Sequence, residues 1–183
     1  MLGVVYGQEC VAATIDKRTF GYIQPIQESK FIFDCTHDIK LFYDSSLQGA
    51  EKTHLEGHQK TALEGHQKTA LEAFLVLVSS LNVPSCHVVI KSEIPVGSGL
   101  GSSASFSVVL ATLMLLFTGR IKDDSSSDDV ILLNDEARNL INEWAFRAEQ
   151  VIHGSPSGVD NTLCTFGGAK IYKKNEPLRT LEG

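Results

Sequence analysis

The stretch EIPVGSGLGSSA, residues 93–104, decides the fold of this chain. An apolar, β-branched run at residues 88–90 leads into it, and a long apolar run at residues 108–117 follows it. This order predicts a strand, a glycine-rich loop and a helix. Because glycine has no Cβ atom, the backbone N–H groups of the loop can turn inward and approach an anion closely. The free N–H groups and positive dipole end of the following helix favour the same ligand, so the stretch predicts a phosphate-binding loop.

The glycine spacing differs from the standard nucleotide-binding fingerprints. The dinucleotide-binding pattern needs glycine at its first, third and sixth positions, and the sixth position counted from Gly97 is Ser102. The P-loop pattern ends in Gly-Lys-Ser/Thr, and no lysine occurs between Lys91 and Lys122. Taken alone, the loop is also compatible with a tight strand-to-helix connection that binds nothing.

The composition is that of an ordinary globular domain, with 183 residues of which 43% are hydrophobic and 21% charged. The formal net charge of −6 argues against a nucleic-acid partner, which usually requires a basic face. The apolar run at residues 108–117 is too short to span a bilayer, so we expect no membrane partner. The first residues, MLGVVY, lack the basic and apolar segments of a signal peptide, and we therefore expect a cytoplasmic protein.

The four cysteines are spread along the chain. Cys10, Cys35, Cys86 and Cys164 form no Cys-x-x-Cys pair and have no zinc-site spacing. We expect them to be buried free thiols, as is usual in a reducing compartment.

Short apolar runs separated by turn residues occupy the beginning of the chain and predict a meander or antiparallel sheet. The expected strands are residues 4–6, 10–15, 19–23, 31–33 and 39–43. The rest of the chain predicts helices at 70–81, 102–118 and 129–153, strands at 83–92 and 169–172, and a polar loop at 122–129. A further short helix is expected through Leu163, with Ser157 as its N-cap residue.

An eight-residue sequence, LEGHQKTA, occurs twice in succession, at residues 55–62 and 63–70. On a helix, a step of this length rotates the second copy by about 80° relative to the first, so the two copies cannot present one face to the same core. Two copies are also too few to stack as a solenoid. We interpret the repeat as a local duplication or an artefact of the gene model.

Two carboxylates follow the glycine-rich loop in sequence. Glu149 lies near the end of the helix expected at 129–153, and Asp160 lies in the turn that opens the next helix. A carboxylate beside a phosphate-binding loop suggests a Mg²⁺ ligand, to which Ser102 or Ser103 would add a hydroxyl oxygen. Asp160 is placed to accept a proton or to orient a hydroxyl nucleophile. The structural alternatives are a surface carboxylate for Glu149 and a helix-dipole partner for Asp160.

These motifs resemble a known family. Residues 94–104 are similar to the second signature of the GHMP small-molecule kinases. The segment WAFRAE at 144–149, followed by IHGSPSGVD at 152–160, resembles the mevalonate kinase branch of that family, as do VVYG at 4–7 and FGGA at 166–169. The resemblance covers nearly the whole chain, but only about the N-terminal half of a family member.

The resemblance implies ATP-dependent phosphorylation of the primary hydroxyl of mevalonate, with ATP and Mg²⁺ as cofactors. Asp160 would be the catalytic acid residue that draws the proton from the substrate hydroxyl, and Ser103 and Glu149 would hold Mg²⁺. The loop on the substrate side would be shaped by His153, Ser155 and Ser157. The ATP phosphates would lie on Gly97, Ser98, Gly99, Leu100, Gly101, Ser102 and Ser103.

The resemblance also implies an α+β fold with helices on one face of a sheet, like the second domain of ribosomal protein S5. Residues 1–183 would form a single N-terminal, ATP-binding domain, truncated at both ends and without the C-terminal GHMP domain. The family's opening strand, with a lysine that stabilises the ionised form of Asp160, would be missing before Met1. An exposed sheet edge predicts marginal stability or aggregation, and a homodimer is left open.

Two hypotheses from different classes follow. The first is a mevalonate kinase represented by a fragment or truncated gene model, with little or no activity by itself, since losing a group that stabilises transition-state charge costs about 10²-fold or more in rate. The second is a short, inactive paralogue that binds nucleotide or a protein partner without turnover. A sibling kinase for phosphomevalonate or galactose fits residues 153–160 less well.

Overall fold

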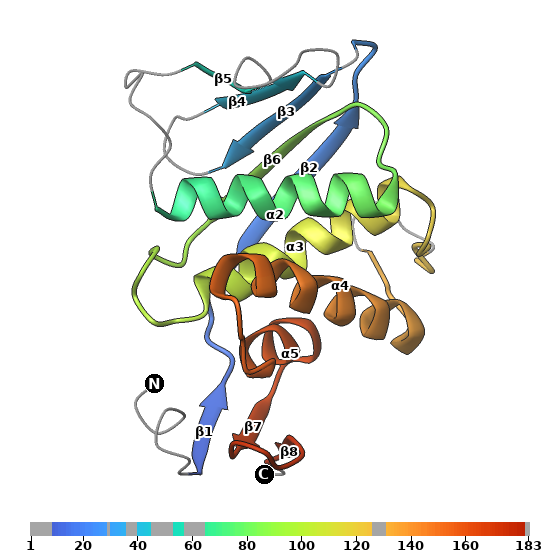
Figure 1. Ribbon diagram of the computed structural model, residues 1–183. Helices are drawn as coiled ribbons and strands as arrows, with labels where there is room; N and C mark the ends of the chain where they lie inside the picture. The colour runs from blue at the N-terminus through green and yellow to red at the C-terminus, as the bar shows by residue number, and fades with distance from the viewer. Residues whose placement is uncertain are drawn as a thin grey trace.

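The computed structural model describes residues 9–28, 30–35, 40–44, 53–56, 65–125 and 131–181, which form a mixed fold of helices and two sheets (Figure 1). The strands are β1 (Cys10–Ala13), β2 (Thr19–Pro25), β3 (Lys30–Cys35), β4 (Lys40–Asp44), β5 (Thr53–Glu56), β6 (Cys86–Ser92), β7 (Ala169–Tyr172) and β8 (Arg179–Thr180). The helices are α2 (His66–Leu81), α3 (Ser102–Phe117), α4 (Asp135–His153) and α5 (Val159–Phe166).

The larger sheet has the strand order β2-β6-β3-β4-β5. Strand β6 pairs antiparallel with β2 and parallel with β3, and the β3-β4 and β4-β5 pairs are antiparallel. The expected meander or antiparallel sheet is therefore wrong, because β6 comes from the middle of the chain, separates β2 from β3 and runs parallel to β3. Its alternate residues Cys86, Val88 and Ile90 are buried. A strand with this many buried apolar residues is best shielded from solvent when it has a neighbouring strand on each side.

The smaller sheet has the order β1-β7-β8 and joins the beginning of the described chain to its end. Strand β1 pairs antiparallel with β7, so it lies outside the sheet in which we expected it. Helix α5 packs on this sheet through Val159 and Leu163, which form a small second core with Ala12. This contact places α5 directly beside the connection from β1 to β2 (Figure 1).

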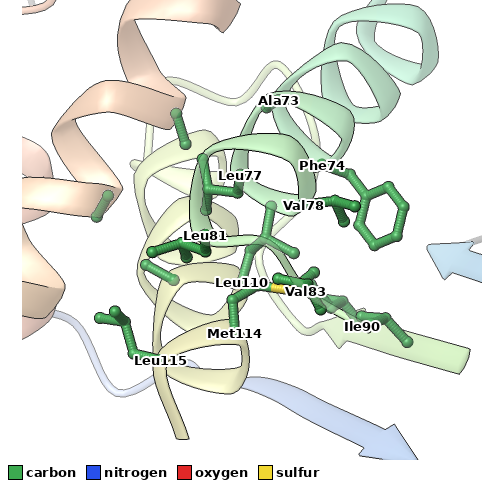
Figure 2. Packing of buried hydrophobic residues seen from close by; sticks show 14 of the residues in the cluster. Ala73, Phe74, Leu77, Val78, Leu81, Val83, Ile90, Leu110, Met114 and Leu115 are labelled. Atoms are coloured by element: carbon green, nitrogen blue, oxygen red, sulfur yellow. The ribbon is translucent and has the colours of Figure 1, made fainter. Parts of the chain in front are cut away.

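The main core lies between the larger sheet and helices α2, α3 and α4, which are all in front of it in Figure 1. Figure 2 shows Leu77 and Leu81 of α2 on the side of Leu110 and Met114 of α3, with Ile90 of β6 to the right of these two residues. The family resemblance implied helices on one face of a sheet, and α2, α3 and α4 are arranged in this way on the larger sheet.

Strand β2 approaches α3 very closely at Gly21. A Cβ atom added there would overlap the side chains of Val109 and Leu113. The neighbouring residues Phe20 and Tyr22 point to the opposite face, away from α2, α3 and α4, where they are 59% and 52% exposed.

Several boundaries differ from those expected. Helix α2 begins at His66 instead of residue 70, and β6 begins at Cys86 instead of residue 83. Helix α4 begins at Asp135 instead of residue 129, because Asn134 is its N-cap residue and accepts a hydrogen bond from the Ala137 N–H at 2.8 Å. Strands β5 and β8 were not expected. The N-cap of α5 is Gly158 instead of Ser157.

The two copies of the repeat do not share one helix. The first copy begins in β5, whereas the last five residues of the second copy, 66–70, belong to α2. Residues 57–64 lie outside the described residues, as does the strand expected at 4–6.

The four cysteines are free, as expected, but only Cys86 is buried and Cys164 is exposed. Within the described ranges, no helix is both long and apolar enough to cross a membrane.

Candidate active site

The glycine-rich loop between β6 and α3 depends on backbone conformations that other residues rarely adopt. Gly97, Gly99 and Gly101 have φ angles of 75°, 72° and 78°, all in the left-handed region. Gly101 is the N-cap residue of α3, and no side chain caps this end of the helix. The first turn of α3 therefore presents backbone N–H groups that can bind an anion.

The loop is open to solvent. Leu100 is 51% exposed, and the Ser98 hydroxyl donates to the Pro95 carbonyl oxygen at 2.7 Å within the loop itself. A Cβ atom on Gly97, Gly99 or Gly101 would contact nothing within 4 Å. These glycines are thus required by their φ angles and not by crowding.

Glu149 of α4 is almost completely buried, with 4% of its surface exposed. The hydroxyl groups of Ser107 and Ser103, one turn apart on α3, donate to its Oε1 at 3.0 Å and its Oε2 at 3.4 Å. Burial raises the pKa of Glu149, and the negative charge of Asp160 acts in the same direction. The hydrogen bond from Ser107, the charge of His153 and the hydrogen bond from Ser103 partly offset this rise in pKa.

His153 lies one turn after Glu149 and joins the same group of side chains. Its Nε2 is 2.9 Å from the Ser103 hydroxyl oxygen and 3.9 Å from Oε2 of Glu149. The end of the glycine-rich loop is thereby connected to the C-terminal end of α4.

Asp160 lies in the first turn of α5. The next residue, Asn161, is 3% exposed, and its side-chain amide donates to Oδ1 of Asn142 in α4 at 2.6 Å. This buried amide pair holds α5 against α4, and therefore holds Asp160 near Glu149.

Two cavities meet at Asp160. The first, of about 260 Å³, is lined by Glu149, His153, Ser157 and Asp160 among others. The second, of about 350 Å³, lies between the β1–β2 connection, the glycine-rich loop and α5. Its lining includes Lys17, Arg18, Leu100, Gly101, Asp160 and Cys164. Asp160 thus lines both the cavity beside the glycine-rich loop and the cavity that Glu149 lines.

Not every expected residue lines these cavities. Ser155 is exposed and belongs to neither lining, although its N–H donates to the His153 carbonyl oxygen at 2.9 Å. Gly97, Ser98, Gly99, Ser102 and Ser103 are also absent from both linings. Residues 97–99 lie on the exposed part of the loop, whereas Ser102 and Ser103 are half-buried in the first turn of α3.

Sequence reasoning missed several residues of the site. Ser107 could have been found, because it follows Ser103 by one helical turn and shares its face. Cys164 likewise follows Asp160 by one turn. Desolvation raises the pKa of the Cys164 thiol to about 11, with Asp160 and Glu149 acting in the same direction, although part of the residue reaches solvent.

The β1–β2 connection gave no signal in the sequence. Glu93 connects it to the loop, because Oε2 of Glu93 accepts a hydrogen bond from the backbone N–H of Arg18 at 3.0 Å. The Glu93 N–H in turn donates to the Arg18 carbonyl oxygen at 2.9 Å. Lys17 and Arg18 thereby lie on the cavity that Asp160 lines.

The model of the N-terminal domain of the GHMP kinases matches residues 68–168. Mevalonate kinase of Schizosaccharomyces pombe is 47% identical over 102 residues, which are 55% of this chain and 24% of that protein. Human mevalonate kinase is 43% identical over 110 residues, 57% of this chain and 28% of that protein. The mouse enzyme is 34% identical over 200 residues, 93% of this chain and 50% of that protein.

Solved structures show the same fold. Mevalonate kinase of Methanococcus jannaschii superposes with a TM-score of 0.65 at 22% identity, over 99% of this chain and 51% of that one. Leishmania major mevalonate kinase, solved with R-mevalonate, superposes with a TM-score of 0.59 at 22% identity, over 96% of this chain and 45% of that one. The chain thus spans about half the length, or less, of these relatives.

Proposed function

Because this chain belongs to the GHMP kinase family, we propose that it is the ATP-binding part of a kinase that phosphorylates mevalonate. The observation that supports this most directly is the convergence of the glycine-rich loop, Glu149 and Asp160 on two adjoining cavities. The identity of the relatives supports the choice of mevalonate as substrate, since each one compared above by sequence is a mevalonate kinase.

The phosphates of ATP would bind to the backbone N–H groups of residues 97–103. The left-handed glycines and the uncapped start of α3 support this role, because they leave N–H groups available to an anion. Lys17, on the neighbouring cavity, adds positive charge that attracts an anionic substrate, whereas Asp16, 3.1 Å from the Arg18 guanidinium, compensates the charge of Arg18.

Ser103 and Glu149 would hold Mg²⁺. Their hard oxygen atoms fit this ion, which prefers one or two protein oxygens together with phosphate oxygens and water. Among the residues that the structure describes, no group of three His, Cys, Asp or Glu side chains could enclose a metal ion. A cation shared with the nucleotide therefore fits better than a site built from protein alone. When bound, Mg²⁺ would neutralise charge on the phosphate oxygens.

Asp160 would accept the proton of the substrate hydroxyl. As that oxygen forms its bond to the γ-phosphorus, the bond from the γ-phosphorus to the bridging oxygen breaks and ADP leaves. The proton then passes from Asp160 to solvent. His153 and Ser157 line the cavity between Asp160 and Glu149, so they would shape the substrate side.

The test compares Asp160→Asn with Asp135→Asn. Asp135 also lies in the first turn of a helix, but it is exposed and outside both cavities. Asp160→Asn should lower mevalonate-dependent ADP release by about 10²- to 10⁴-fold, the usual contribution of a general base. Binding of MgATP should change little, and Asp135→Asn should change neither quantity. Absence of MgATP binding, or turnover that is indifferent to Asp160→Asn, would overturn the proposal.

The expected rate of the 183-residue chain is far below the roughly 1–100 s⁻¹ typical of kinases, because the chain spans only about half the length of the mevalonate kinases that it resembles. A rate within that range would contradict this expectation. Nucleotide binding without any turnover, both in the 183-residue chain and in a chain extended to the length of its relatives, would favour the inactive paralogue. Phosphomevalonate and galactose, offered as acceptors in the same assay, test the sibling activities.

We also propose that residues 1–183 form one N-terminal domain of the family. The absent first strand, the likeness to ribosomal protein S5, the cytoplasmic location and the homodimer stay predictions.

A further inference from the structure

Ser107 is a fully buried hydroxyl group that the proposed reaction does not yet use. It has 0% of its surface exposed, and it lies on the inner face of α3, one turn after Ser103. Its hydroxyl donates to Oε1 of Glu149 at 3.0 Å, from within the interior between α3 and α4. A buried hydroxyl that loses its partner is costly, so this hydrogen bond is one that the folded protein retains.

The two oxygens of Glu149 are held unequally. Oε1 has the shorter hydrogen bond, from the buried Ser107. Oε2 has the longer one, 3.4 Å, from Ser103, whose hydroxyl oxygen is also 2.9 Å from Nε2 of His153. Ser103 lies at the end of the glycine-rich loop and has a second partner available, so it can release Oε2 at small cost.

We propose that Ser107 is a positioning residue, which ties Oε1 of Glu149 inside the protein and leaves only Oε2 for a divalent cation. Glu149 then binds through one oxygen, and the site favours Mg²⁺ over Ca²⁺. This inference rests on the proposed metal role of Glu149.

The selectivity follows from the coordination habits of the two ions. Mg²⁺ demands near-ideal octahedral geometry with few carboxylate oxygens and accepts a single one from Glu149. Ca²⁺ takes six to eight oxygens and often binds a carboxylate through both. To bind both oxygens here, Ca²⁺ would have to displace the Ser107 hydroxyl from Oε1 and leave it buried without a partner.

The experiment measures the dissociation constants of MgATP and CaATP for the 183-residue chain by titration calorimetry. The variant is Ser107→Ala, and the matched control is Thr112→Ala. Thr112 is another hydroxyl residue of α3, but it donates to the Val108 carbonyl oxygen at 2.8 Å and does not touch Glu149.

Ser107→Ala should weaken MgATP binding by about 10-fold, within the range of about 10- to 100-fold usual for partners of metal ligands, and weaken CaATP binding less. The preference for Mg²⁺ over Ca²⁺ should therefore shrink by several-fold. Thr112→Ala should leave both dissociation constants within about twofold of the wild-type values. Cysteine has a weaker donor of similar size, so the preference of Ser107→Cys for Mg²⁺ over Ca²⁺ should lie between those of wild type and Ser107→Ala.

Infrared spectra of the chain labelled with ¹³C at glutamate carboxyl groups supply a second readout. The separation of the two carboxylate stretching bands distinguishes one-oxygen from two-oxygen binding. Wild type with MgATP should show the one-oxygen pattern, and Ser107→Ala with CaATP the two-oxygen pattern.

An unchanged ratio of the two dissociation constants in Ser107→Ala would overturn the inference and leave the proposed function standing. MgATP binding that is indifferent to Glu149→Gln would remove the metal role of Glu149, and this inference with it. If Ser107→Ala fails to fold, the dissociation constants of Ser107→Cys and the infrared spectrum of wild type test the proposal instead. A two-oxygen pattern with MgATP in wild type would refute it.

Discussion

At the scale of single residues, Glu149 is the side chain on which burial and hydrogen bonding oppose one another. Burial favours its neutral form, whereas Ser107, Ser103 and His153 favour its charged form. Burial is the largest of these effects, so the carboxylate carries a free-energy cost in the folded state. Buried ionisable groups with a shifted pKa are common at the functional sites of proteins.

This cost predicts how stability depends on pH. Below the ordinary glutamate pKa of 4.5, the carboxyl is protonated in both the folded and the unfolded chain. As the pH rises from 4.5 through the raised pKa of the folded state, the unfolded chain releases its proton first, so stability falls. Glu149→Gln has no proton to release. The Tm of this variant minus the Tm of wild type should therefore increase as the pH rises through this range.

Thermal unfolding of the nucleotide-free chain at a series of pH values measures this gain. Glu143→Gln is the control, because Glu143 lies on the same helix but is exposed and paired with Arg147 at 2.6 Å. Its Tm difference from wild type should show no such rise. A Tm difference for Glu149→Gln that shrinks as the pH rises would show that the fold favours the carboxylate.

At the scale of elements, the site depends on how α3, α4 and α5 pack. Helix α3 supplies Ser103 and Ser107, α4 supplies Glu149, and α5 supplies Asp160. The position of α3 is set partly by its close contact with β2 at Gly21, where two side chains of α3 fill the space of the absent Cβ atom.

Gly21→Ala should therefore destabilise the protein by about 1–3 kcal/mol, the usual cost of overpacking. The cause is overlap of the added methyl group with Val109 and Leu113. Val109→Ala makes room for that methyl group, so the double variant should lose less than the sum of the two single losses. Denaturant unfolding of wild type, the two single variants and the double variant measures these differences. Strict additivity of the losses in stability would contradict the proposed contact.

The same change tests the link between fold and site. Because α3 begins at the glycine-rich loop, a shift of this helix should also weaken MgATP binding in Gly21→Ala. Unchanged MgATP binding would mean that the loop is insensitive to the contact between β2 and α3.

At the scale of the whole molecule, the larger sheet has exposed features that favour association. Among the described strands, β2 is at its edge, and Phe20 and Tyr22 lie exposed on the face turned away from α2, α3 and α4. Edge strands offer unpaired backbone groups, and exposed aromatic residues add apolar surface.

We therefore expect the isolated chain to be marginally stable and to associate as its concentration rises. Sedimentation velocity over a concentration series and repeated thermal scans measure this. A control with Phe20→Lys and Tyr22→Lys should associate less, because lysine on an edge strand opposes pairing. A sharp, reversible melt of a monomer at all concentrations would contradict this expectation.

Local patterns predicted most elements but not their partners. Strands β1 to β4, β6 and β7 and the helix expected at 102–118 were found from apolar runs and turn residues, since these signals lie within a few neighbouring residues. The meander was wrong, because hydrophobic alternation shows that a strand exists but not which strand lies beside it. The start of α4 was missed because the apolar residues Ile131, Leu132 and Leu133, directly before the capping residue Asn134, extend the helical pattern upstream of it.

The sequence by itself determined the family and the glycine-rich loop, because a positive φ angle requires glycine and a contiguous motif keeps its spacing in any fold. The sequence also indicated Glu149 and Asp160. Only the tertiary structure decided that β6 separates β2 from β3, that Asn161 holds α5 to α4, and that Ser107 reaches Glu149. These contacts join residues 19 or more positions apart, and their energies arise from burial and hydrogen bonding that exist only once the helices pack.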